Sequence, residues 1–188
     1  CNKLWNAARF VLMHCEEFSA QGKPAAVSES ERWLLNQLAT ATEQTQQHIA
    51  EYRFDLASAC LYEFTWNTYC DWFLEFAKPA LSGDDLESAD SMRHTLLFAL
   101  EATLRLLHPL MPFITEEIWQ NIAPKLGITG LSISTQAYPE AAGFGHAYQQ
   151  AVANIEWLKA LVASIRSIRS EMGISPAKAI PLLWQSNH

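Results

Sequence analysis

Apolar residues recur every three or four positions along almost the whole chain, and this spacing limits the fold more than any other feature. Near the start, Leu4, Ala8, Val11, Cys15 and Phe18 follow each other at steps of four and three. Side chains at such steps lie on one face of an α-helix, whereas a half-buried strand needs strict alternation. The spacing therefore predicts a mainly α protein.

Glycine, proline and capping residues divide this pattern into separate helices. Ser28-x-x-Glu31 is a capping box, Asp55 can cap a helix, residues 82–85 form a turn at which a helix can start, and Gly127 is suited to a helix end. Pro79 disfavours helical geometry in the residue before it, and Thr115 stands where a further helix can begin. We predict helices at about 1–18, 28–52, 55–78, 85–107, 115–125 and 148–172.

Two short segments of the C-terminal part suggest strands. Residues 131–134 alternate apolar with polar side chains, and residues 179–184 could pair with them. We therefore predict an up-and-down helical bundle over residues 1–127, followed over residues 128–188 by a small α/β appendage with two short strands and one long helix.

Composition excludes several classes of protein. Hydrophobic residues make up 49% and charged residues 18% of the chain, which excludes disordered and collagen-like sequences. No uncharged apolar run approaches the roughly 18 residues of a membrane span. The four cysteines form no Cys-x-x-Cys pair, as expected of a reduced intracellular protein. Because helical sequence begins at Cys1 without a cap, we expect the chain to be part of a longer one.

Three residues of the first segment lie off its apolar stripe. Lys3, Asn6 and Phe10 fall together on a second line, more than about 90° away around a helix. An aromatic ring beside a cation and an amide suits base stacking, which contributes roughly 1–3 kcal/mol per base. The alternative is that Phe10 packs against another helix of a bundle with wide apolar faces.

The helix predicted over residues 55–78 has two contrasting faces. One is aromatic and is predicted to be core: Tyr62, Trp66, Tyr69 and Phe73, with Ala77. The other carries Glu63, Asn67, Asp71 and Glu75 at steps of four, with Leu74 beside them. Carboxylates one turn apart repel each other unless donors face them, and base amines are such donors. A solvated acidic face is the alternative.

Catalytic and metal-binding patterns are absent from the sequence. No Glu has a His three residues later, as a di-iron bundle requires, and His48-x-x-Glu51 has the reverse order. Phosphate loops, nucleophile elbows and His-Glu-x-x-His are also missing. We predict no catalytic residue, metal site or cofactor in this chain. The net charge of −7 argues against nucleic acid, yet cations gather towards the ends, where Arg166 and Arg169 are further candidates for phosphate contacts.

Several motifs resemble those of a known family. Residues 2–10 (NKLWNAARF), 62–67 (YEFTWN), 69–72 (YCDW) and 74–75 (LE) are similar to the anticodon-binding domain of bacterial valyl-tRNA synthetases. Residues 106–119 (LLHPLMPFITEEIW) resemble a corner shared by the valyl, isoleucyl and leucyl enzymes of class I, and residues 165–172 (IRSIRSEM) complete the match. Gly173 and Ser175 depart from the usual Asn and Pro of the family.

The resemblance implies roles for particular residues. The positions that contact the anticodon loop in this family match Lys3, Asn6, Phe10, Leu74 and Glu75. Phe10 would stack on a base, Asn6 and Glu75 would read base edges, Lys3 would contact a phosphate or base, and Leu74 would give apolar support. Arg166 and Arg169 would contact the RNA backbone or acidic residues of the fold.

The resemblance also implies the activity of a larger enzyme. That enzyme would be a cytoplasmic and monomeric ligase that joins valine to valine-accepting tRNA with ATP and Mg²⁺. The His-Ile-Gly-His and Lys-Met-Ser-Lys-Ser signatures of class I catalysis do not occur here, so catalysis is expected upstream. The alternatives are an isoleucyl or leucyl enzyme, a helical protein-interaction module, or a bundle that binds a metal or small molecule.

Overall fold

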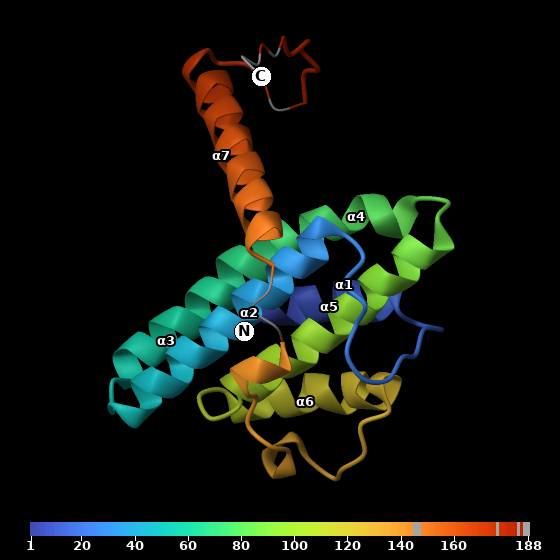
Figure 1. Cartoon of the computed structure of the whole chain (residues 1–188), viewed down its shortest axis with the longest axis vertical. Helices are drawn as coiled ribbons and strands as arrows, with labels where there is room; N and C mark the ends of the chain where they lie inside the picture. The colour runs from blue at the N-terminus through green and yellow to red at the C-terminus, as the bar shows by residue number, and fades with distance from the viewer. Residues whose placement is uncertain (145–147, 176, 184, 186–188) are drawn as a thin grey trace.

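The computed structural model describes residues 1–144, 148–175, 177–183 and 185, and in these residues it contains helices but no strand (Figure 1). The α-helices are α1 (Asn2–His14), α2 (Glu29–Ala50), α3 (Phe54–Glu63), α4 (Leu74–Ser82), α5 (Leu86–Leu107), α6 (Pro112–Ile122) and α7 (Gln149–Glu171). A π-helical segment, η1 (Phe64–Phe73), joins α3 to α4. Short 3₁₀ turns are η2 (Ala123–Leu126), η3 (Ile133–Thr135) and η4 (Ala141–Gly143). The prediction of a mainly α bundle is confirmed.

Local capping sets two of the helix starts, and the capping box at Ser28 is confirmed. Asp55, predicted to cap a helix, instead lies in the first turn of α3, whose N-cap is Arg53. The Ser28 hydroxyl accepts a hydrogen bond from the Glu31 amide, and the Glu31 carboxylate accepts one from the Ser28 amide. The Asp85 carboxylate accepts bonds from the amides of Glu87 and Ser88. Each cap satisfies backbone donors that have no partner inside the helix.

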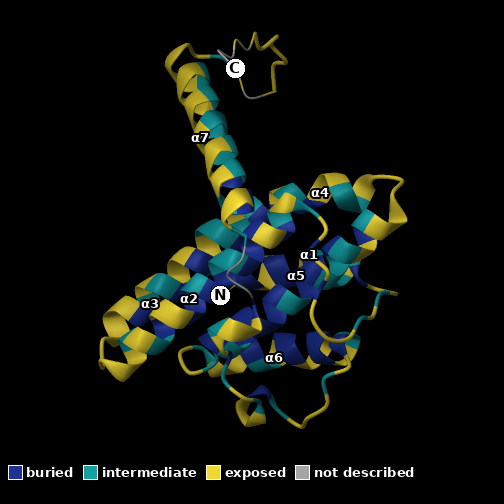
Figure 2. Ribbon diagram, viewed as in Figure 1, coloured by how far each residue is buried: buried dark blue, intermediate teal, exposed yellow. Residues whose placement is uncertain are grey.

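The core lies where α1, α2, η1 and α4 surround α5 (Figure 2). Fully buried side chains come from each: Val11, Trp33, Leu38, Phe73, Ala77, Leu96 and Leu100. The Tyr69 hydroxyl donates to the Leu96 carbonyl oxygen at 3.0 Å, which ties η1 to α5 within this core. The periodic stripe of α1 is part of it, since Leu4, Ala8 and Val11 are buried, as predicted. Cys15, directly after α1, is buried as well, whereas Phe18, predicted for the same stripe, is only partly buried.

Two buried carboxylates connect the helices by hydrogen bonds. Glu31 of α2 accepts bonds from the hydroxyls of Ser91 and Thr95 on α5. Glu101 of α5 accepts one from the indole of Trp119 on α6 at 3.0 Å and pairs with Arg105. A buried carboxylate is tolerated only where donors surround it, so these contacts fix the order of α2, α5 and α6.

Helix α7 extends away from the bundle (Figure 1), and only its first turns are buried. Ala151 and Ile155 are buried, and the Trp33 indole donates to the Glu156 carboxylate at 2.9 Å. The one long helix predicted for the C-terminal part is thereby confirmed. No helix among the described residues is long and apolar enough to cross a membrane.

Several predicted helix ends were wrong. α1 ends at His14 instead of Phe18, and α6 begins at Pro112 instead of Thr115. Proline is favoured in the first turn, where its missing N–H would have no partner. Pro79 lies inside α4 without ending it. Pro79 and Glu75 are both exposed, so the Glu75 carbonyl that Pro79 leaves unbonded can be solvated.

The prediction that this aromatic face belongs to the core was only partly correct. Tyr69, Phe73 and Ala77 are fully buried, but Tyr62 is 56% and Trp66 is 38% exposed. The reason is η1, because a π-helix bonds residue i to i+5 and widens each turn. The spacing of an α-helix then no longer predicts which side chains share a face.

Both predicted strands are absent from the described residues. Residues 131–134 form a bend followed by η3, because the Ser132 hydroxyl accepts from the Ser134 amide and donates to Glu116. These local hydrogen bonds replace strand pairing. Residues 179–183 form no regular structure, and Trp184 lies outside the described residues. The division into residues 1–127 and 128–188 stays a prediction.

We predict that Glu101→Ala lowers the free energy of unfolding by about 2–4 kcal/mol, because the Trp119 indole and the Arg105 guanidinium lose their buried acceptor. Urea denaturation followed by circular dichroism measures this change. The control is Glu117→Ala, which removes an exposed acid of α6 and should change stability by less than about 0.5 kcal/mol. Equal effects of the two substitutions would contradict the role of Glu101.

Candidate functional site

The three residues singled out on α1 lie outside its buried stripe. Asn6 is exposed, and Lys3 and Phe10 are half-buried. One side of Phe10 packs against the core, and its ring centroid lies 4.4 Å from that of His14. Phe10 is therefore neither sealed in the interior nor free in solvent, and part of its ring is available to a ligand.

Lys3 joins α1 to the π-helical segment. Its ammonium nitrogen lies 2.5 Å from a carboxylate oxygen of Asp71 and 4.1 Å from the ring centroid of Trp66. Trp66 in turn stacks on Tyr62, with ring centroids 5.3 Å apart and planes inclined by 17°. One cation thus contacts both a carboxylate and an aromatic face, two interactions that favour the same position of α1.

The row of acidic side chains has partners along its length. Asn67 donates to Glu63 at 2.6 Å, Lys3 pairs with Asp71, and Lys78 pairs with Glu75 at 2.6 Å. These donors relieve the repulsion expected between carboxylates one turn apart. Glu75 is exposed, whereas Leu74 is 9% exposed and belongs to the core.

The two arginines of α7 differ in their surroundings. The guanidinium of Arg166 lies 5.6 Å from the ring centroid of Trp72, on η1, and the residue is exposed. Arg169 donates to the carbonyl oxygens of Ser175 and Lys178, beyond the end of the helix. Arg166 is therefore available to a ligand close to α4, whereas Arg169 holds the turn that follows α7.

The structure brings some of the predicted residues together and leaves others apart. Lys3 contacts Asp71 of η1, which precedes Leu74 by three residues. Arg166 of α7 contacts Trp72 of the same segment. The described contacts of Phe10 are with His14 and the core, and those of Glu75 are with Lys78. A ligand that touched both Phe10 and Glu75 would have to reach across from α1 to α4.

The aromatic partners of these cations, Trp66 and Trp72, were not identified from the sequence. Trp72 lies within 5.6 Å of both Lys159 and Arg166, measured to its ring centroid, and Trp66 receives Lys3. The available signal was the density of tryptophan: Trp66 and Trp72 fall within seven residues, next to the acidic row. The partners could not be identified from spacing, because they come from α1 and α7.

The described residues offer little for metal or covalent chemistry. Among them, no group of three His, Cys, Asp or Glu side chains is placed to hold a metal ion. Burial raises the pKa of the Cys70 thiol, beside Lys3, to about 11 despite the opposing effect of the Lys3 charge. A neutral thiol is a poor nucleophile, so Cys70 does not suit covalent chemistry and instead forms part of an apolar wall. The arrangement suits binding by stacking and hydrogen bonding.

Comparison with known proteins decides among the families that the geometry allows. The family model of the anticodon-binding domain of tRNA ligase matches residues 31–183. The chain belongs to this family. The matched residues include Leu74, Glu75, Arg166 and Arg169 of the anticodon-binding domain, whereas α1 precedes them.

Individual relatives match this chain over nearly its entire length. It is 53% identical over 186 residues to a valine–tRNA ligase of Stenotrophomonas maltophilia (strain R551-3) and 54% identical over 187 residues to one of Xanthomonas campestris pv. campestris (strain B100), in each case over 99% of this chain. A valine–tRNA ligase of Xanthomonas euvesicatoria is 52% identical over all 188 residues. The chain spans only 19–20% of the length of these relatives.

We predict that Lys3→Met lowers the free energy of unfolding by about 1 kcal/mol, because the partly exposed ion pair and the cation–π contact are both lost. Urea denaturation measures the change. Lys23→Met, which removes an exposed cation from the loop before α2, is the matched control and should be close to neutral. A loss no larger than that of the control would show that Lys3 does not fix α1 on η1.

Proposed function

We propose that this chain is the anticodon-binding domain of a valine–tRNA ligase and holds the anticodon loop of valine-accepting tRNA. The observation that carries the proposal is the identity of 52–54% with valine–tRNA ligases along the entire chain. It includes α1, which the family model does not reach. The ligase as a whole would use ATP and Mg²⁺ in the cytoplasm as a monomer, and its catalytic part would lie upstream of this chain.

The proposed RNA surface uses side chains that the core leaves unused. The half-buried Phe10 ring stacks on an unpaired base. At base edges, the exposed Asn6 amide donates or accepts hydrogen bonds, and the exposed Glu75 carboxylate accepts them. Leu74, the neighbour of Glu75 in the sequence, packs in the core and so holds this part of α4 in place. Splayed bases of a single-stranded loop can reach both helices, whereas paired bases cannot.

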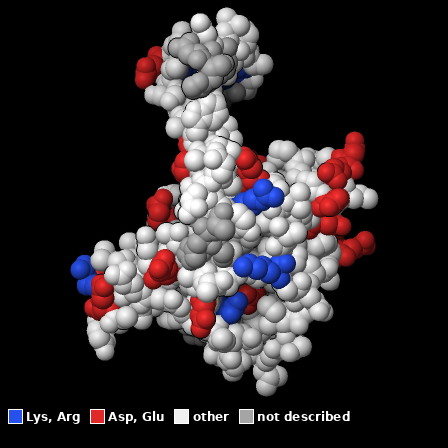
Figure 3. Space-filling model, in the orientation of Figure 1, with Lys and Arg blue, Asp and Glu red and all other residues white. Residues whose placement is uncertain are grey.

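This surface has few cations, and they already contact carboxylate or aromatic side chains of the chain itself. Lys3 would share its charge between Asp71 and a nearby phosphate or base, and Arg166 would reach a phosphate from its position over Trp72. On the face shown in Figure 3, acidic side chains gather around the turn between α4 and α5. The exposed acidic residues of this turn and of the start of α5 are Asp84, Asp85, Glu87 and Asp90. RNA would therefore approach on a side away from this turn.

A helical protein-interaction module is the alternative from another class, favoured by the exposed aromatic pair Tyr62 and Trp66. The dependence of binding affinity on salt concentration distinguishes the two functions. RNA binding that involves cations weakens as salt rises, while docking on an apolar surface does not. An isoleucyl or leucyl enzyme is the closer alternative and differs in which tRNA it prefers.

We predict that Phe10→Ala weakens binding of an anticodon stem-loop by about 1–3 kcal/mol through loss of base stacking. Fluorescence anisotropy with labelled RNA measures the affinity. Phe10→Leu fills most of the same volume without an aromatic face, so it should keep the fold and still weaken binding. The matched control is Phe113→Ala, which removes a ring that is 90% exposed on α6 and should leave RNA affinity unchanged.

A wild-type affinity of the Phe10→Leu variant would show that the ring serves packing alone. The thermal midpoint of each variant confirms that the comparison is made on folded protein.

A further inference from the structure

Pro79 stands inside a continuous helical segment, one turn after the acidic residue proposed to contact a base. The chain is helical from Phe54 through η1 to Ser82, so α4 continues for three residues beyond Pro79. Proline is the least favourable residue at such a position, because it has no N–H and its ring crowds the carbonyl of the residue four positions earlier. That residue is Glu75, and the helical hydrogen bond to its carbonyl oxygen therefore cannot form.

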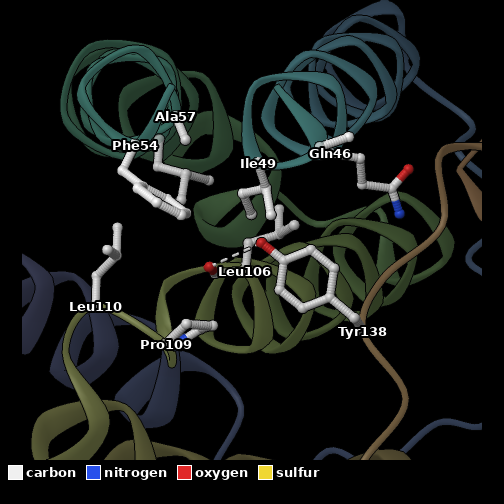
Figure 4. A pocket seen from close by; sticks show the side chains of 10 residues that line it. Gln46, Ile49, Phe54, Ala57, Leu106, Pro109, Leu110 and Tyr138 are labelled. Atoms are coloured by element: carbon white, nitrogen blue, oxygen red, sulfur yellow. Dashed lines mark hydrogen bonds between the residues drawn. The ribbon is translucent and has the colours of Figure 1, made fainter. Parts of the chain in front are cut away.

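At helix ends elsewhere in the bundle, carbonyl oxygens have side-chain donors. The Arg93 guanidinium donates to the carbonyl oxygen of His14, the last residue of α1, at 3.0 Å. Near the end of α5, the Tyr138 hydroxyl donates to the Leu106 carbonyl oxygen at 3.2 Å, and Figure 4 shows this bond beside an apolar hollow. Carbonyl groups without a helical partner are thus satisfied within the fold at these two places.

The Glu75 carbonyl has no such donor and lies on an exposed face of α4. Lys78, Pro79 and Ser82 follow Glu75 by three, four and seven positions, so the four residues share one face, and all are exposed. The Ser82 hydroxyl donates to the carbonyl oxygen of Lys78 at 2.7 Å. Among the described residues, no side chain donates to the carbonyl oxygen of Glu75. This oxygen is left to solvent or to a ligand.

The ion pair with Lys78 brings the Glu75 carboxylate to the side on which its carbonyl lies. Carbonyl groups of an α-helix point towards its C-terminal end, and Lys78 is one turn away in that direction. The Lys78 ammonium nitrogen lies 2.6 Å from Oε1 of Glu75. The other carboxylate oxygen, Oε2, has no hydrogen bond or ion pair among the described residues. Glu75 therefore presents two available acceptors beside one cation.

We propose that Pro79 is a positioning residue for RNA recognition, because it leaves the Glu75 carbonyl available to accept a hydrogen bond from the anticodon loop. This bond adds to the one that the Glu75 carboxylate makes at a base edge. Its donor is an N–H group of a base or a ribose 2′-hydroxyl, the donors that single-stranded RNA offers. The inference rests on the proposed function, since it needs RNA to bind at α4.

The substitution Pro79→Ala restores an N–H group at position 79 and tests the proposal. The restored helical bond should raise the thermal midpoint of unfolding and protect the new amide from hydrogen exchange measured by NMR. Because the same bond engages the Glu75 carbonyl, affinity for the anticodon stem-loop of valine-accepting tRNA should fall about three- to tenfold, as expected for one hydrogen bond. Fluorescence anisotropy measures this affinity. Stability and affinity should thus change in opposite directions.

The matched control is Pro124→Ala, which removes an exposed proline from the first turn of η2, where proline costs no helical hydrogen bond. It should leave RNA affinity unchanged. Modified stem-loops identify the donor: one series replaces each loop ribose with deoxyribose, and a second removes each base amine. The stem-loop that lacks the donor should bind the unaltered chain and the Pro79→Ala variant equally.

Three outcomes would overturn the proposal. Unchanged affinity of a Pro79→Ala variant whose new amide is protected would show that RNA does not use the carbonyl. A less stable variant, or one whose new amide exchanges freely, would show that Pro79 is not what leaves the carbonyl without a partner. A loss of affinity that persists with every modified stem-loop would show that Pro79 acts only through the path of α4. In these three cases the unaltered chain still binds RNA and the proposed function stands, whereas failure of the unaltered chain to bind any stem-loop would contradict both.

Discussion

The contact of the Lys3 ammonium with Asp71 and Trp66 is the interaction on which the candidate RNA surface depends. It joins α1 to η1, one turn before Leu74 and Glu75, and so sets where the exposed residues of α1 stand relative to those of α4. An ion pair of this exposure and a cation–π contact each contribute about 0.5–1 kcal/mol, which is small beside the buried core. The core therefore holds the helices together, and Lys3 adjusts how two of them meet.

The same organisation recurs where α7 meets the bundle. Lys159 lies 5.1 Å from the ring centroid of Trp33 and 5.6 Å from that of Trp72, and Arg166 lies over Trp72 as well. Aromatic rings receive the cations here, and the carboxylate of Glu156 accepts from Trp33. Thus an acidic chain, with a net charge of −7, keeps several of its cations on the helices that border the candidate surface.

The sequence predicted what depends on local chemistry. The capping box at Ser28, the turn at residues 82–85 before α5 and the buried stripe of α1 follow from short-range rules, and all are present. It failed where tertiary contacts or unusual geometry decide. The π-helical turns of η1 leave Tyr62 and Trp66 exposed, and the bonds of Ser132 to Glu116 replace a strand.

For the candidate site, residue spacing alone separated Lys3, Asn6 and Phe10 from the core stripe. Spacing could not show that Lys3 contacts Asp71 or that Arg166 contacts Trp72, because these partners are distant along the chain.

The central claim is that α1 and α4 together hold unpaired bases and that Glu75 reads one of them. The most direct test is a titration of the chain and its Glu75→Gln variant with valine-accepting and isoleucine-accepting tRNA at one salt concentration. The account predicts at least about tenfold tighter binding of the valine-accepting tRNA by the unaltered chain, and a variant that loses this preference more than it loses affinity. Equal affinities of the unaltered chain for the two tRNAs, or equal weakening of both by Glu75→Gln, would contradict it.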